Sequence, residues 1–198
     1  MSLIDAEAAT DPVALFRAWL REAEAQEPND PNAVALATAT SAGVPSVRMV
    51  LLKGLDERGF AFYTNAESRK GMELAENPRA AMCFHWKSLR RQVRVEGLVS
   101  ELPDAEADVY FHTRSRGSQL GAVASRQSRP LVSRELLEER VEAAEARYPK
   151  TIPRPDFWRG YVLWPERMEF WVNGVERLHD RFLFVRTEVG WAKERLFP

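Results

Sequence analysis

Residues 33–65 read AVALATATSAGVPSVRMVLLKGLDERGFAFYTN. Three strand-like runs, 33–40, 47–54 and 59–65, are separated by the turn sequences SAGVP and LDERG. Strands joined by short turns that contain glycine are typical of antiparallel hairpins. The stretch therefore predicts an antiparallel meander. Further strands are predicted in AAMCFHW, in RQVRVEGLVSEL, and in the closing segments 160–174 and 177–198.

Helical patterns interrupt these strands without alternating with them. Apolar residues at helical spacing predict a helix over 11–25, with Asp11 as its N-cap and Pro12 in its first turn. Further helices are predicted over 68–78, starting at Ser68, and over 104–115 and 133–147. Because the chain has no regular βαβ alternation and no G-x-G-x-x-G motif, we expect one mainly β domain over 1–198. It would be an antiparallel barrel with accessory helices, preceded by a flexible N-terminus, 1–10.

The composition excludes several classes of protein. The formal net charge of -1 leaves no global basic field for nucleic acid or an anionic membrane. No stretch has the length of a transmembrane helix or the pattern of a signal peptide, so a soluble, cytoplasmic protein is expected. The single cysteine, Cys83, favours a reducing compartment and a buried, inert thiol. His85 and His112 have no metal-ligand spacing, and no metal is expected.

Two basic clusters lie in the first half of the chain. Arg69 and Lys70 open the helix after FYTN, beside the hydroxyls of Thr64 and Ser68. A helix N-terminus with two cations suits a phosphate, although a solvated first turn explains the same residues. Arg48 and Lys53 differ by an odd number, so a regular strand directs them to opposite faces and toward two different anions. Basic residues that protect an edge strand are the alternative.

Two more clusters lie in the second half. Tyr110, Arg114 and Ser118 are spaced four apart on a predicted helix, where phenol, guanidinium and hydroxyl could clamp a phosphate monoester. In a strand, Arg177, His179 and Arg181 share one face and would repel one another without an anionic or electron-rich ligand. Surface stacking and a salt-bridged edge strand are the respective alternatives.

These clusters, in this order, resemble the pyridoxamine 5'-phosphate oxidase family. The segments that carry the resemblance are RMVLLK, FYTN with SRK, RQV, YFHTR with SQLGA, SRQS, EFW with RLHDRF, and the terminal WAKERLFP. Together they cover about residues 11–198. The resemblance implies an FMN-binding split β-barrel and a homodimer with FMN at the subunit interface, so that site residues come from two chains.

The resemblance also implies two ligand sites. FMN would be bound by Arg48, Met49, Val50, Leu51, Leu52, Lys53, Tyr63, Thr64, Arg69, Lys70, Gln92, Gln127, Ser128, Trp171 and Arg181. The substrate phosphate would be bound by Lys53, Tyr110, Arg114 and Ser118, and Arg177 and His179 would be catalytic, facing the substrate ring.

The implied reaction is oxidation of pyridoxamine or pyridoxine 5'-phosphate to pyridoxal 5'-phosphate, in the pathway of vitamin B6. A hydride would pass from the substrate C4' to the flavin, O2 would reoxidise the flavin to give hydrogen peroxide, and the amine would release ammonia. The sequence lacks the N-terminal Arg-x-x-Tyr element that closes over substrate in many members. The alternatives are a phenazine-biosynthesis flavin oxidase, which lacks the Lys53 and Arg114 phosphate contacts, and a non-catalytic flavin- or haem-binding barrel.

Overall fold

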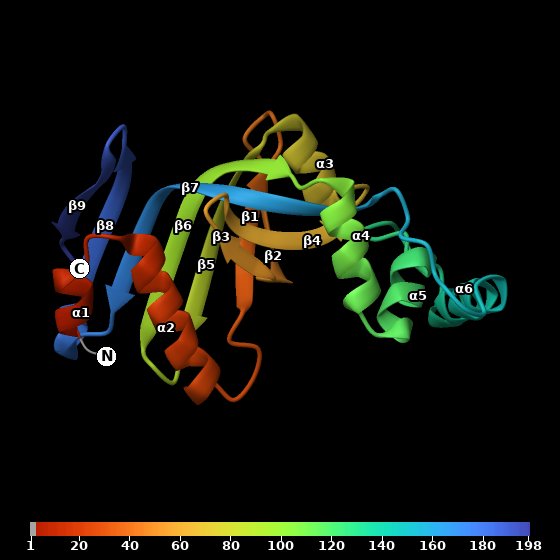
Figure 1. Ribbon diagram of the computed structural model, residues 1–198, viewed down its shortest axis with the longest axis horizontal. Coiled ribbons are helices and arrows are strands. Elements are labelled where there is room, and N and C mark those ends of the chain that lie inside the picture. Colours follow the sequence, from red (N-terminus) through yellow and green to blue (C-terminus); the bar gives the residue numbers. More distant parts are fainter. Residues whose placement is uncertain (1–2) are drawn as a thin grey trace.

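The computed structural model describes residues 3–198, and a curled antiparallel sheet forms its centre (Figure 1). The strands are β1 (Ala33–Ala39), β2 (Pro45–Leu51), β3 (Gly54–Asp56), β4 (Gly59–Asn65), β5 (Arg79–Trp86), β6 (Arg91–Glu101), β7 (Trp158–Val172), β8 (Asp180–Thr187) and β9 (Gly190–Leu196). Their order is β2-β1-β5-β6-β7-β4-β3, and β8 and β9 extend the sheet from β7. The predicted class, mainly antiparallel β with accessory helices, is confirmed.

The helices gather at the two ends of the sheet and across it. They are α1 (Leu3–Ala8), α2 (Pro12–Gln26), α3 (Arg69–Glu76), α4 (Asp104–Thr113), α5 (Arg116–Ala124) and α6 (Arg134–Arg147), with a single 3-10 turn, η1 (Val175–Arg177). Figure 1 shows α4, α5 and α6 at one end of the long axis, and α1 with β8 and β9 at the other. None of the helices between residues 3 and 198 is long and apolar enough to cross a membrane.

Two helix starts that the sequence predicts are confirmed by their capping bonds. The Asp11 carboxylate accepts hydrogen bonds from the N–H groups of Val13 and Ala14, at 2.8 and 3.2 Å, and α2 begins at Pro12. Ser68 caps α3 in the same way, through the Gly71 N–H. Side-chain acceptors at the N-cap satisfy backbone donors that the first turn leaves unpaired.

Two apolar clusters hold the helices on the sheet. Phe16 of α2 packs edge-to-face on Phe60 and Phe84, with ring centroids 4.9 and 4.8 Å apart. Each such fully buried ring contributes about 1.5–3 kcal/mol. A smaller cluster around Phe111 and Trp158 fixes α4 and α5 against the start of β7. This second cluster places the helical end of the molecule beside β4.

Three predictions of local structure are wrong. Residues 33–65 do not form a meander, because the predicted strand 47–54 divides between β2 and β3, which lie at opposite ends of the strand order. Tyr110, Arg114 and Ser118 do not share a helix, because α4 ends at Thr113 and the Ser115 side chain caps a new helix, α5, which the sequence reading missed. Arg177 and His179 do not lie in a strand, because β8 begins only at Asp180.

The residues before β8 form a tight turn instead of a strand. Glu176 and Arg177 both have positive φ angles, 54° and 68°. The Leu178 N–H donates to the Val175 carbonyl, and a Cβ on Gly174 would lie 1.8 Å from the Leu178 carbonyl oxygen. Only glycine allows this close approach, so the chain reverses here before it joins the sheet.

Part of the N-terminal segment expected to be flexible is helical. Residues 3–8 form α1, and Lys193 Nζ on β9 donates to the backbone carbonyls of Ala6 and Ala9, at 2.7 and 3.1 Å. A cation at the C-terminal end of a helix satisfies carbonyls that have no intrahelical partner. This contact anchors the helix to the C-terminal strands, and the prediction is corrected for these residues.

Candidate active site

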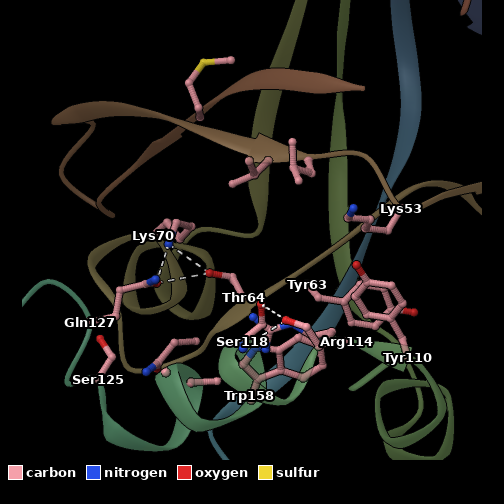
Figure 2. A pocket seen from close by; sticks show the side chains of 17 residues that line it. Lys53, Tyr63, Thr64, Lys70, Tyr110, Arg114, Ser118, Ser125, Gln127 and Trp158 are labelled. Atoms are coloured by element: carbon pink, nitrogen blue, oxygen red, sulfur yellow. Dashed lines mark hydrogen bonds between the residues drawn. The ribbon is translucent and has the colours of Figure 1, made fainter. Parts of the chain in front are cut away.

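A cavity of about 660 Å³ opens where β2 and β4 approach α4 and α5 (Figure 2). Within the described chain its wall carries the cations Lys53, Lys70 and Arg114 and no carboxylate. Such a wall suits an anionic ligand with an aromatic part, because hydroxyl, amide and aromatic groups complete it. The lining residues are Met49, Val50, Leu51, Lys53, Tyr63, Thr64, Asn65, Lys70, Tyr110, Arg114, Ser115, Ser118, Gly121, Ala122, Ser125, Gln127 and Trp158.

Lys70 forms one end of this cavity, in the first turn of α3. Its side chain is 7% exposed, and Nζ donates to Thr64 Oγ1 at 2.9 Å and to Gln127 Oε1 at 2.8 Å (Figure 2). No carboxylate in residues 6–198 pairs with it. Burial, and after it the charge of Arg48, lowers the pKa of Lys70 from 10.5 to about 8. A buried ammonium among neutral oxygens favours binding of an anion beside it.

Arg114 forms the other end, at the junction of α4 and α5. Its guanidinium lies over the Trp158 ring, 5.0 Å from the centroid, and burial lowers its pKa. Its Nη1 is buried and has no hydrogen-bond partner among the described residues. Tyr63 and Tyr110 stack beside it with centroids 4.1 Å apart (Figure 2). An unsatisfied buried donor is costly, so this end is also suited to an oxyanion.

A smaller hollow of about 390 Å³ adjoins the cavity on the other side of Met49. It shares Met49, Lys70 and Gln127 with the cavity and adds Ser46, Val47, Arg48, Arg69 and Ser128. Arg48 thus lines the hollow and Lys53 lines the cavity, but β2 ends at Leu51, so strand parity is not the reason. The two spaces together could accept a ligand pair that carries two separate phosphates.

A second group of predicted site residues lies elsewhere, where β6, β7 and β8 meet; we call it the β7–β8 corner. The corner consists of Gln92, Trp171, Arg177, His179 and Arg181. Trp171 pairs in register with Gln92 and Arg181, and its ring lies 4.6 Å from that of His179. Arg181 Nε donates to Glu169 at 2.8 Å. None of the five corner residues lines the cavity or the hollow.

The structure therefore divides the predicted site residues into two groups. The cavity and hollow together contain Arg48, Met49, Val50, Leu51, Lys53, Tyr63, Thr64, Arg69, Lys70, Tyr110, Arg114, Ser118, Gln127 and Ser128. Leu52 does not line either space, because its side chain is buried in the main core.

The sequence reading missed several residues of the cavity wall. Trp158 is the most consequential, because it supports Arg114. Its position follows from the pairing of Asn65 with Trp158 between β4 and β7, which no local pattern reveals. Ser115 was detectable in principle, since a serine before R-G-S is a plausible N-cap. The others are Asn65, Gly121, Ala122 and Ser125.

Models of protein families match both halves of the chain. A model described as pyridoxamine 5'-phosphate oxidase matches residues 20–148. A second, described as the pyridoxine 5'-phosphate oxidase C-terminal dimerisation region, matches residues 158–198. The first contains the cavity wall up to Gln127, and the second contains the β7–β8 corner except Gln92.

Individual relatives agree over nearly the full length. A pyridoxine/pyridoxamine 5'-phosphate oxidase from Gluconobacter oxydans is 58% identical over 197 residues, which cover 99% of this chain and 98% of the relative. An enzyme of the same name from Rhizobium etli is 59% identical over 191 residues, 95% of this chain and 93% of the relative. Among solved structures, PhzG from Burkholderia lata, in complex with tetrahydrophenazine-1-carboxylic acid, is 34% identical with a TM-score of 0.94, covering 100% of this chain and 98% of that one.

Proposed function

The chain belongs to the pyridoxamine 5'-phosphate oxidase family, and from this premise we propose that its cavity and a partner subunit's β7–β8 corner together form the active site. The relatives that are 56–59% identical are all named pyridoxine/pyridoxamine 5'-phosphate oxidase, and this chain is an oxidase of that kind. The single observation that carries the proposal is the pair of cations Lys70 and Arg114 at opposite ends of one cavity, neither of which has a carboxylate partner among residues 6–198.

The hollow and the Lys70 end of the cavity suit FMN. Arg48, Arg69 and Lys70 would hold its phosphate, with Gln127 and Ser128 beside them. The flavin would lie along residues 49–53, next to Tyr63 and Thr64, and the partner's Gln92, Trp171 and Arg181 would complete its site. The buried ammonium of Lys70 supports this fit, because an anion would offset the cost of burying its charge. When bound, FMN would accept two electrons from the substrate, and O2 would then take up these electrons with two protons to give hydrogen peroxide.

The Arg114 end suits the phosphate of the substrate. The unpaired Nη1 of Arg114 offers a donor, and Lys53, Tyr110 and Ser118 line the same wall. An arginine that is already held over Trp158 loses little side-chain entropy when it binds an oxyanion bidentately. The phosphate-binding set at the Arg114 end argues against the phenazine-type alternative, whose substrate carries no phosphate. It also argues against a flavin-binding module without a second anion site.

A homodimer is supported by the position of the corner and by the dimerisation region that the C-terminal part matches. Trp158 lines the cavity at the start of β7, whereas Trp171 lies near its other end. At about 3.3 Å per residue, this separation is roughly 40 Å along the curved strand. The corner of one chain is therefore poorly placed to complete its own cavity, and a second copy could supply it.

The corner suggests distinct roles for its two predicted catalytic residues. The Gly174 N–H donates to His179 Nδ1 at 3.1 Å, so a neutral His179 carries its proton on Nε2. We propose that His179 presents this Nε2–H to the substrate as a hydrogen-bond donor. Arg177, in its left-handed backbone conformation, would orient and polarise the substrate ring.

Oxygen consumption tests the activity and the phosphate clamp together. FMN-loaded protein is given pyridoxamine 5'-phosphate, with unphosphorylated pyridoxamine as the matched control. We expect turnover only with the phosphorylated amine, and equal rates with both would contradict the assignment of the Arg114 end. Bound flavin without turnover of either would favour the flavin-binding alternatives.

Since Cys83 is the single cysteine, which is typical of a reducing compartment, we propose that the enzyme works in the cytoplasm.

Mixed dimers test whether two chains build one site. Arg114→Ala removes a cavity residue and Arg177→Ala a corner residue, so each homodimer should have little activity when the substrate is well below the raised KM. In a heterodimer one of the two sites keeps both arginines, and random pairing should restore roughly a quarter of wild-type activity. Co-expression of Arg114→Ala with Lys53→Ala, two cavity variants, is the control and should restore nothing. Failure of the first mixture to recover activity would show that each chain builds its own site.

A further inference from the structure

Glu73 is a buried carboxylate in the second turn of α3 that lines neither the cavity nor the hollow. It is 4% exposed, and with Glu169 it is one of the two buried acids in residues 6–198. Arg69 Nε donates to its Oε1 at 2.9 Å, and Arg48 Nη2 lies 3.3 Å from its Oε2. Both arginines line the hollow, as does Ser46, so Glu73 contacts the proposed phosphate site through these three side chains.

Two hydroxyls complete the environment of this carboxylate. Thr38 Oγ1 and Ser46 Oγ both donate to Glu73 Oε2, and Arg48 in turn donates to each of these hydroxyls. Burial acts to raise the pKa of Glu73, but the bonds from Ser46, Thr38, Arg69 and Arg48 outweigh it and lower the pKa to about 2. The carboxylate is therefore charged at any physiological pH. It binds Arg48 directly and also through the hydroxyls of Thr38 and Ser46, so the hydrogen bonds form a closed network.

The network also sets the net charge of the hollow and the orientation of its arginine side chains. Arg48, Arg69 and Lys70 bring three positive charges, of which Glu73 offsets one. The two that remain match a phosphate monoester, which carries about −1.5 to −2 at pH 7. Without Glu73 the two arginines would repel each other and Lys70, and their long side chains would be free to turn toward solvent.

We propose that Glu73 is a positioning residue, which holds Arg48 and Arg69 in the orientation that binds the phosphate of the flavin. This inference rests on the proposed function, because it takes the hollow as the site of the FMN phosphate. It makes a prediction opposite to that of simple electrostatics. Removing a negative charge near an anion site should tighten anion binding, whereas loss of positioning should weaken it.

The test compares FMN with riboflavin, which lacks the phosphate, in fluorescence titrations of the apoprotein. For Glu73→Gln we expect about tenfold weaker binding of FMN, the value of one charge-assisted hydrogen bond, and unchanged binding of riboflavin. General damage to the fold would weaken both ligands. Tighter binding of FMN by Glu73→Gln, or an unchanged preference for FMN over riboflavin, would overturn the proposal.

Two further variants keep the test decisive. Thr38→Val removes a hydroxyl of the network but no charge, and it should also weaken binding of FMN and not of riboflavin. It provides the test if Glu73→Gln does not fold. Glu76→Gln changes an exposed acid on the same helix, whose bond from Ser41 Oγ is 3.4 Å long, and it should behave as wild type. If the wild-type apoprotein itself shows no preference for FMN, the phosphate site, and not only the role of Glu73, is refuted.

Discussion

Lys70 couples the proposed binding of FMN to the uptake of a proton. In the protein without ligand its ammonium is buried, and its pKa is about 8 instead of 10.5. Each tenfold change in proton affinity corresponds to about 1.36 kcal/mol, so burial disfavours the charged form by roughly 3 kcal/mol. Since the pKa is lowered on folding, this penalty is fully present below pH 8 and disappears as the pH rises to 10.5.

A bound phosphate dianion reverses this balance, because it stabilises the ammonium beside it. Above pH 8 the apoprotein has lost the Lys70 proton, and FMN must restore it to gain the charged contact. We therefore expect the affinity for FMN to fall about tenfold between pH 7 and pH 9. At pH 9 nearly one proton should be taken up for each FMN bound. The phosphate itself does not titrate in this range, since its second pKa is about 6.

Isothermal titration calorimetry of the apoprotein with FMN measures both quantities, when it is repeated in two buffers of different ionisation enthalpy. Lys70→Met, which has no proton to take up, is the control and should bind FMN weakly and with little dependence on pH. Riboflavin should show no proton uptake with either protein. A wild-type affinity that is constant from pH 7 to pH 9, or a dependence that persists in Lys70→Met, would refute the assignment of Lys70 to the phosphate.

Three other substitutions have defined outcomes. Arg114→Ala should raise the KM for pyridoxamine 5'-phosphate by about 10–100-fold, from the loss of about 1.5–3 kcal/mol, and leave the flavin content unchanged; steady-state kinetics and the flavin absorbance check both. Gly71→Ala puts a Cβ 2.2 Å from the Ala66 carbonyl oxygen, so it should lower the free energy of unfolding in urea by about 1–3 kcal/mol. It should also reduce the FMN that the protein retains in dialysis, and an unchanged midpoint of urea unfolding would contradict this reasoning. Lys193→Met removes the cation that binds the backbone carbonyls at the end of α1. Amide hydrogen exchange of residues 3–8 should accelerate while turnover is unaffected, and unaltered exchange would show that other contacts anchor α1.

Local sequence patterns were sufficient for much of the secondary structure. The β1–β2 hairpin and the helix starts at Asp11, Ser68 and Ser133 depend on neighbours a few positions away, and the structure has them where the sequence predicts. The same reasoning failed where two local signals compete. Residues 104–118 fit a helix throughout, but Ser115 can also start a helix, and that preference divides the segment.

The predicted site residues were identified because their types and order resemble a known family. What the sequence could not give is their arrangement. Trp158 lies under Arg114 because β4 and β7 pair in one register, and Gln92 lies beside Trp171 because β6 and β7 pair in another. Such pairings join residues far apart in the chain, and they are set by the packing of the whole core.

The sequence by itself therefore indicated most of the strand and helix segments, the helix caps and the residue types of the predicted site. The tertiary structure alone decided that the cavity and the β7–β8 corner are separate, that Glu73 pairs with Arg48 and Arg69, and that no described carboxylate pairs with Lys70 or Arg114. The physical reason is range: caps and turns depend on contacts between near neighbours, whereas burial and charge pairing depend on which distant segments the fold brings together.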